Sequence, residues 1–195
     1  MTSELEIKRS RFRCDLVPVE SEDAARDRVE QARKEFWDAR HHCSAFILGP
    51  DRRIERSNDD GEPAGTAGAP MLEVLRGSEL TDVVAVVTRW FGGTLLGAGG
   101  LVRAYSDAVR EAVAVAPVIT RELLGEWAVE VPHADAGRVE SVLRQQGFDI
   151  VDHNYAAAVT LHVATTRADE LAAILAAETR GESQPVRVGE RWVTR

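Results

Sequence analysis

The sequence has few cysteines and no long apolar runs. Cys14 and Cys43 are its only cysteines, and two thiols so far apart make neither a disulfide framework nor a zinc ribbon. The first residues, MTSELEIKRSRFRCDL, lack the apolar stretch of a secretory signal. No window approaches about 18 consecutive apolar residues, so no membrane span is expected. We therefore expect a cytoplasmic protein with reduced thiols.

Basic residues are also in short supply. The 195 residues include 32 Asp and Glu against 24 Lys and Arg, a net charge of −8. Binding along a nucleic-acid duplex usually needs a basic face, so this charge argues against a general nucleic-acid coat and leaves room only for a local basic groove. Hydrophobic residues make up 44% of the chain, which is enough for a packed core and excludes whole-chain disorder.

Hydrophobic periodicity and turn residues divide the first part of the chain into alternating strands and helices. Ser21 is a good N-cap for a helix, because its hydroxyl can accept from a free backbone amide and acidic residues follow it. The β-branched run 83–91 is typical of a strand buried on both faces. We expect strands over 4–17, 43–49, 53–57 and 83–91, and helices over 21–37, 69–77 and 101–116.

The pattern restarts near residue 119. The remaining segments predict the order β-α-β-β-α-β, the split βαβ pattern. We therefore expect an α+β protein of two domains, residues 1–118 and 119–195. The second contains strands over 127–133, 148–155, 157–164 and 185–193, and helices over 134–147 and 167–179.

A run of glycines between the strand 83–91 and the next helix is the strongest local feature. Glycine lets a backbone approach a ligand closely, and a helix N-terminus offers free amides, so we predict an anion or phosphate site, with tight backbone packing as the alternative. Val102 breaks the dinucleotide fingerprint, and the P-loop sequence is absent. Residues 83–106 contain two arginines and no carboxylate. The candidate phosphate- or nucleic-acid-binding residues are Arg89, Trp90, Gly92, Gly93, Gly97, Gly99, Gly100, Arg103 and Tyr105.

Two neighbouring segments form a secondary candidate site. Asp59, Asp60 and Glu62 could hold Mg²⁺ together with a phosphate, or could form a solvated acidic turn. His41 and Cys43 share one face of a strand, which gives two converging ligands and no complete zinc site. A buried thiol beside a histidine pair is favoured over a nucleophile. The secondary candidates are Arg40, His41, His42, Cys43, Asn58, Asp59, Asp60, Glu62, Gly65 and Thr66.

The four tryptophans are scattered along the chain. We expect Trp37, Trp127 and Trp192 in the core or at a domain interface. Trp90 is the exception, because it directly precedes the glycine run. Trp90 or Tyr105 could stack on a nucleic-acid base.

Three segments make the chain resemble the IMPACT family, in its bacterial YigZ-like branch. They are WDARHHCSAFILG (37–49), SNDDGEPAGTAGAPML (57–72) and VVAVVTRWFGGTLLGAGGLVRAYSDAV (83–109). Trp90 departs from the tyrosine that is more usual there. The resemblance implies that the first domain folds like the second domain of a small-subunit ribosomal protein and domain IV of elongation factor G. It implies a ferredoxin-like second domain, similar to domain V of that factor.

Eukaryotic relatives act in translational control, so the resemblance implies a link to translation. Our first hypothesis is a non-catalytic translation-associated regulator that binds RNA, the ribosome or a translation-related protein and needs no cofactor. The alternative is a Mg²⁺-dependent enzyme acting on a nucleotide or phosphorylated small molecule, with Asp59, Asp60 and Glu62 as ligands. A third possibility is a protein-interaction module in which the glycines serve packing alone.

Overall fold

The computed structural model describes residues 1–194 and divides into two compact units, Met1–Pro117 and Val118–Arg195, which we call the N-terminal and C-terminal units. Each unit has its own sheet and its own hydrophobic core. In the part of the chain that is described, two antiparallel sheets and five helices give the predicted α+β class. None of these helices is both long enough and apolar enough to span a bilayer.

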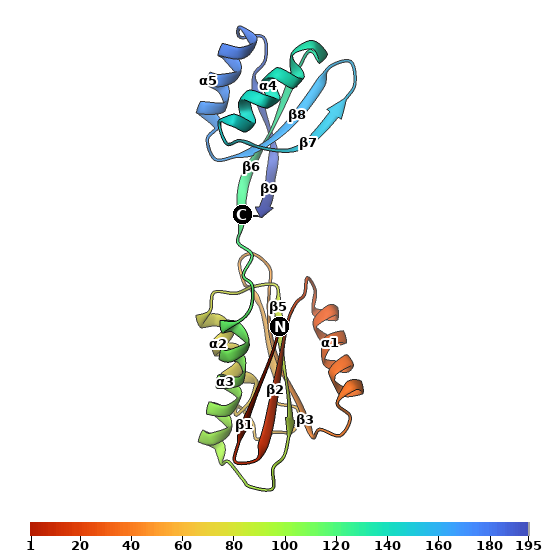
Figure 1. The fold of residues 1–195 in the computed structure, drawn as a ribbon, viewed down its shortest axis with the longest axis vertical. Helices are drawn as coiled ribbons and strands as arrows, with labels where there is room; N and C mark the ends of the chain where they lie inside the picture. The colour runs from red at the N-terminus through yellow and green to blue at the C-terminus, as the bar shows by residue number, and fades with distance from the viewer. Residues whose placement is uncertain (195) are drawn as a thin grey trace. The chain divides into compact units, whose positions relative to one another are not determined.

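The N-terminal unit is a five-stranded antiparallel sheet with helices on both faces (Figure 1). Its strand order is β1 (Thr2–Ile7), β2 (Ser10–Pro18), β5 (Val83–Trp90), β3 (His41–Leu48) and β4 (Ile54–Asn58). Helix α1 (Glu22–Glu35) covers one face, and α2 (Gly68–Gly77) and α3 (Ala98–Ala114) cover the other. Strand β5 is buried on both faces, as predicted: Val84 and Val86 face α1, and Val83, Ala85 and Val87 join the core with α2 and α3.

The predicted start of helix α1 is confirmed. Ser21 has an extended backbone, and its side chain accepts a hydrogen bond from the Ala24 amide at 3.1 Å. Glu22 and Asp23 lie in the first turn, where the positive end of the helix dipole favours negative charge. The cap and the charges together fix where the helix begins.

The single strand predicted over 4–17 is wrong, because the structure has a β-hairpin there. Strands β1 and β2 pair in antiparallel register from Thr2 opposite Asp15 to Ile7 opposite Ser10. Lys8 and Arg9 form the two-residue turn, with φ angles of 47° and 67°. Such turns normally carry Asn-Gly or Asp-Gly, so a Lys-Arg pair gives no turn signal in the sequence.

The C-terminal unit has the predicted βαββαβ order. Its elements are β6 (Arg121–Val131), α4 (His133–Gln145), β7 (Asp149–Tyr155), β8 (Val159–Thr165), α5 (Ala168–Thr179) and β9 (Pro185–Thr194). The antiparallel strand order is β7-β8-β6-β9, and inward residues of β6 and β8 form one core with α4 and α5. Strand β6 begins earlier than predicted, because its residues Arg121–Leu124 pair with β9 alone.

Gly92 provides a test of how the hairpin is held. A Cβ atom at this position would lie 2.1 Å from the Arg9 carbonyl carbon and 2.3 Å from the Ser10 nitrogen. Gly92→Ala should therefore push the turn away and destabilise the protein by about 1–3 kcal/mol in urea denaturation. Gly99→Ala is the matched control, since a Cβ there meets nothing within 4 Å. The control should be neutral or slightly stabilising, by up to about 1 kcal/mol; equal losses in both variants would contradict the account.

Candidate functional site

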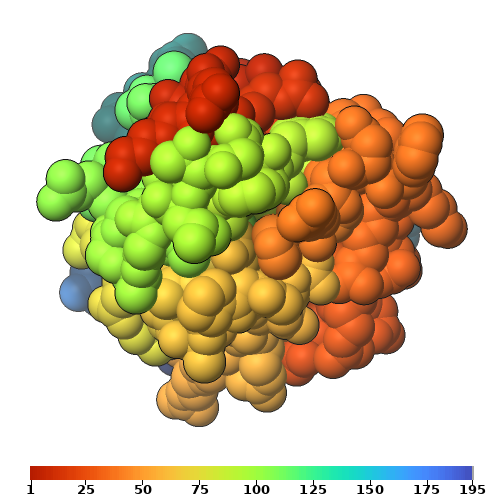
Figure 2. All heavy atoms as spheres, turned by 90° about the horizontal axis from the view of Figure 1, so that it is seen from below, coloured from red at the N-terminus to blue at the C-terminus, as the bar shows by residue number. Residues whose placement is uncertain are grey.

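Four connecting segments of the N-terminal unit lie at one end of its sheet, which we call the loop end. Strand register brings them together: Trp90 at the end of β5 pairs with Arg11 near the start of β2, and Arg89 pairs with His41 at the start of β3. Strand β4 ends at Asn58, beside the same end of β3. The loop end thus comprises the turn 8–9 and the segments 36–40, 59–67 and 91–97. Figure 2 looks onto it and shows the four segments side by side.

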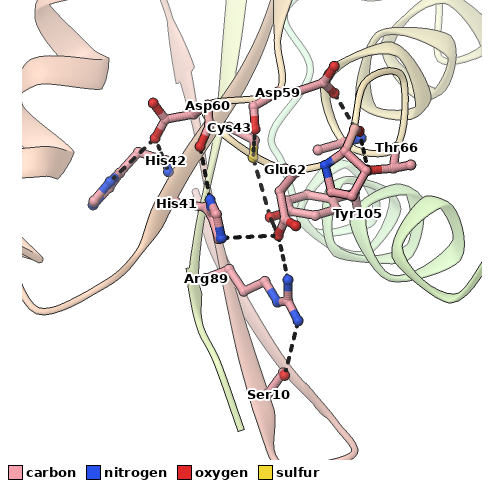
Figure 3. Close-up of polar contacts among 12 residues, drawn as sticks. Ser10, His41, His42, Cys43, Asp59, Asp60, Glu62, Thr66, Arg89 and Tyr105 are labelled. Carbon is pink, nitrogen blue, oxygen red and sulfur yellow. Dashed lines mark hydrogen bonds and ion pairs between the residues drawn. The ribbon is translucent and has the colours of Figure 1, made fainter. Parts of the chain in front are cut away.

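A buried carboxylate joins three of the elements below the loop end (Figure 3). The Glu62 side chain is 4% exposed, and its Oε1 accepts hydrogen bonds from Arg89 Nη1 at 2.5 Å and Tyr105 Oη at 2.7 Å. His41 Nε2 lies 3.9 Å from the same oxygen. Glu62 therefore connects the loop 59–67 to strands β3 and β5 and helix α3.

Two residues predicted to contact nucleic acid are buried instead. Arg89 is 5% exposed and faces Glu62, and its Nη2 donates to Ser10 Oγ at 3.4 Å. The Phe12 and Phe91 rings lie 5.3 and 5.6 Å from its guanidinium carbon. Tyr105 is fully buried, so it offers no face for a base to stack on. Both residues support the loop end from beneath.

Trp90 is half-buried and already has aromatic and cationic neighbours. The guanidinium carbon of Arg11 lies 3.8 Å from the centre of its ring, and the Phe36 ring meets it edge-on at 5.5 Å. These contacts cover the indole that we expected to be available for stacking. Trp37, expected in the core or at an interface, is instead 81% exposed at the loop end, which corrects that expectation.

Cys43 lies inside the buried cluster as a protonated thiol. Its sulfur is 3.0 Å from the Asp59 carbonyl oxygen and 3.3 Å from Tyr105 Oη. Burial raises the pKa of Cys43 to about 12, and nearby carboxylates add to the effect. Because the thiolate is the reactive form, this environment opposes a nucleophilic role.

The two histidines before Cys43 contact backbone oxygens. His41 Nδ1 lies 2.9 Å from the Asp60 carbonyl oxygen, and His42 Nε2 lies 3.2 Å from that of Phe36. Burial lowers the pKa of His42, so the neutral ring is favoured. Both rings therefore hold the segments of the loop end in place.

Asp59 caps the start of helix α2. Its carboxylate accepts from the amides of Gly65 at 2.8 Å, Ala67 at 3.0 Å and Gly68 at 2.7 Å. Burial alone would raise the pKa of Asp59, but these three donors outweigh it and hold the pKa below its ordinary value. Thr66 Oγ1 donates to a carbonyl of the same loop. The glycine-rich stretch therefore folds around the carboxylate of Asp59.

Asp60 faces away from Asp59. Its Oδ1 accepts from Arg33 Nη2 at 2.5 Å, its Oδ2 accepts from the His42 amide at 2.6 Å, and its own amide donates to Asn58 Oδ1. The three carboxylates of the loop thus have separate partners. Within residues 1–194, no group of three or more His, Cys, Asp or Glu side chains could hold a metal ion. The Mg²⁺ alternative loses the ligand cluster on which it depended.

The glycines before helix α3 and in its first turn differ in why the position is glycine. Gly92 permits the close approach to the hairpin, whereas Gly93 and Gly97 have φ angles of 83° and 73°. Gly100 is partly constrained by the Leu96 side chain, and Gly99 faces open space. Gly97 provides no side-chain cap for the helix. Close packing therefore explains the glycine at 92, and a left-handed backbone explains those at 93 and 97. The first turn of α3 stays accessible at Gly99.

The solvent-facing residues of the loop end are largely cationic and apolar. Arg40 extends over the Phe91 ring, with 5.5 Å from its guanidinium carbon to the ring centre. Leu95 is 83% exposed, and Asp38 is an exposed carboxylate of the same end. Arg40 and Arg103 are predicted from sequence, but three exposed residues of the loop end are not: Lys8, Arg9 and Trp37. The basic residues at 8, 9 and 11 were the available signal for Lys8 and Arg9, whereas Trp37 was expected in the core or at an interface.

Removing the buried charge tests the role of Glu62. Glu62→Gln leaves the Arg89 guanidinium buried without its counter-charge and should destabilise the protein by about 3–5 kcal/mol in urea denaturation. The control Glu73→Gln breaks a surface ion pair with Arg76 and should cost less than about 1 kcal/mol. The double variant Glu62→Gln/Arg89→Met should be less destabilised than the sum of its single variants. Additive losses would show that the pair is not coupled.

The lowered pKa of Asp59 predicts a dependence of stability on pH. The stabilisation is present above the unfolded pKa of about 3.9 and is lost as the pH falls through the lower folded value. Asp59→Asn should cost about 1 kcal/mol at pH 7, as for a lost helix cap, and the difference from wild type should shrink towards pH 3. Urea denaturation at several pH values measures this. Exposed Asp38→Asn should show little change, and an equal dependence there would refute the assignment.

Comparison with known proteins identifies the family. The Impact N-terminal domain model matches residues 8–113, and a domain of unknown function (DUF1949) matches residues 129–181. The chain is 41% identical to the IMPACT family member YigZ of Escherichia coli, over 95% of this chain and 93% of the relative. It is 43% identical to YvyE of Bacillus subtilis, over 78% and 70%. A crystal structure described only as that of a hypothetical protein matches 97% of this chain and 94% of its own, with a TM-score of 0.64 and 39% identity. The chain therefore belongs to the IMPACT family.

Proposed function

We propose that this IMPACT-family protein is a non-catalytic, translation-associated module of the cytoplasm that binds RNA at its loop end. One observation carries the proposal: the acidic residues of the loop end are largely neutralised from within, while its basic residues face solvent. Asp60 pairs with Arg33, Glu62 pairs with Arg89, and Asp59 is satisfied by backbone amides. The surface is thus locally cationic on a protein of net charge −8.

The exposed arginines suit phosphate recognition. Within residues 1–194, Arg40 and Arg103 form no ion pair, so their donors are available to a ligand. A guanidinium presents a fork of donors that matches phosphate oxygens. The accessible first turn of α3 precedes Arg103 in the same helix and adds backbone amides.

Trp37 supplies the aromatic surface that RNA binding needs. It is 81% exposed, so its indole is open to a partner that would cover it. Bases stack on aromatic rings with little regard to sequence, at about 1–3 kcal/mol per base. In this proposal Trp37, rather than Trp90 or Tyr105, stacks on a base.

Fold likeness supports the link to translation. The strand order β7-β8-β6-β9 with two helices on one face is the ferredoxin-like arrangement. We infer that the two units are similar to domains IV and V of elongation factor G, which suggests ribosomal RNA as the target. This likeness is one of fold alone, and the chemistry of the loop end does not depend on it.

Charge removal at the loop end (Arg40) and on the adjoining helix α3 (Arg103) tests the proposal. Arg40→Ala/Arg103→Ala should weaken binding to single-stranded RNA about tenfold and reduce the salt slope by about 1.4, for two lost phosphate contacts. Filter binding from low to moderate salt measures both. The control Arg53→Ala/Arg110→Ala removes the same charge away from the loop end and should bind like wild type. The absence of saturable binding by wild type at low salt would refute RNA binding.

A further inference from the structure

The hairpin turn at the loop end has an unfavourable backbone for its residues. Lys8 and Arg9 both adopt left-handed conformations, with φ angles of 47° and 67°. In this region the Cβ of an L-residue crowds its own backbone, so hairpin turns of this kind favour Asn, Asp and Gly. The chain instead places two long cationic side chains at both central positions.

The turn is held firmly despite this cost. Ser10 is fully buried, and its Oγ accepts from the Gly92 amide at 3.1 Å. Gly92 lies so close to the Arg9 backbone that no Cβ fits between them. Arg9 Nη2 also donates to Thr94 Oγ1 at 3.3 Å. The turn therefore has a fixed position beside the glycine loop.

Neither core packing nor an ion pair within the unit explains why Lys8 and Arg9 occupy the turn. Lys8 and Arg9 are both exposed, and among residues 1–194 neither forms a salt bridge. The nearest strand carboxylate by register, Glu6, lies opposite Arg11. Costly backbone conformations persist where the surrounding structure enforces them, and they cluster at functional sites.

We propose that the Lys8–Arg9 turn is a phosphate-binding element that grips the backbone of single-stranded RNA. The inference rests on the proposed function and assigns it two residues. The turn lies on one side of the glycine loop, and Arg40, over Phe91, lies on another. A phosphodiester chain crossing the loop end would meet cations on both sides, with Trp37 available to a base. An acidic protein could also pair with these cations. Its side chains would gain less than a base does from contact with the flat ring of Trp37.

A variant that relieves the backbone strain separates this idea from a structural role. Lys8→Asn/Arg9→Gly installs the preferred turn residues and removes both cations. Its melting temperature should rise, while its affinity for a labelled oligouridine should fall about tenfold and its salt slope by about 1.4. Thermal denaturation and fluorescence anisotropy of the full chain measure the two effects. The charge-preserving control Lys8→Arg/Arg9→Lys should bind like wild type.

Three other results would each overturn part of the proposal. Unchanged affinity in Lys8→Asn/Arg9→Gly, with wild type binding normally, overturns the role of the turn and leaves the proposed function standing. A melting temperature that does not rise overturns the strain argument on which the inference depends. Failure of wild type to bind the oligouridine, with binding of a polyglutamate peptide instead, overturns both and identifies an acidic protein as the partner.

Discussion

The pairing of Glu62 with Arg89 is the interaction on which the loop end depends. A carboxylate with so little solvent contact must be compensated, and Arg89 and Tyr105 do this through one oxygen. Arg89 comes from the central strand and Tyr105 from α3, so the loop 59–67 is fixed to both layers. Arg89 also reaches Ser10, which holds the Gly92 amide. Hairpin, glycine loop and acidic loop are thus linked through one buried charge pair.

This arrangement separates two roles that the sequence mixes. Residues 58–68 and 89–103 contain acids, arginines and glycines in close succession, and their types alone do not show which side chains face solvent. The fold turns Glu62 and Arg89 inwards, where each cancels the other, and leaves Arg40 and Arg103 outside. The buried charges are therefore hidden from a ligand, and the exposed charged residues of the loop end are Lys8, Arg9 and Arg40 against a single carboxylate, Asp38. A protein with excess negative charge can present a cationic surface in this way.

Local signals explain which parts could be predicted from sequence. Ser21 and the apolar run of β5 have strong local signatures, so α1 and the buried strand were predicted correctly. The order of elements in the C-terminal unit followed from the same reasoning. The Lys8–Arg9 turn was missed because tertiary contact with Gly92 enforces a conformation that its residues disfavour. The partners of Asp59 and Asp60 depend on chain segments far along the sequence, and the exposure of Trp37 depends on where α1 ends.

The two cysteines give the N-terminal unit built-in reporters of its own opening. Cys14 on β2 and Cys43 on β3 are both fully buried, on strands that flank β5. Burial raises the pKa of each thiol, so even a reagent that reached them would find the unreactive form. Alkylation therefore requires that the strands separate and expose the two thiols. The rate of labelling thus measures how often the strands separate, without any engineered probe.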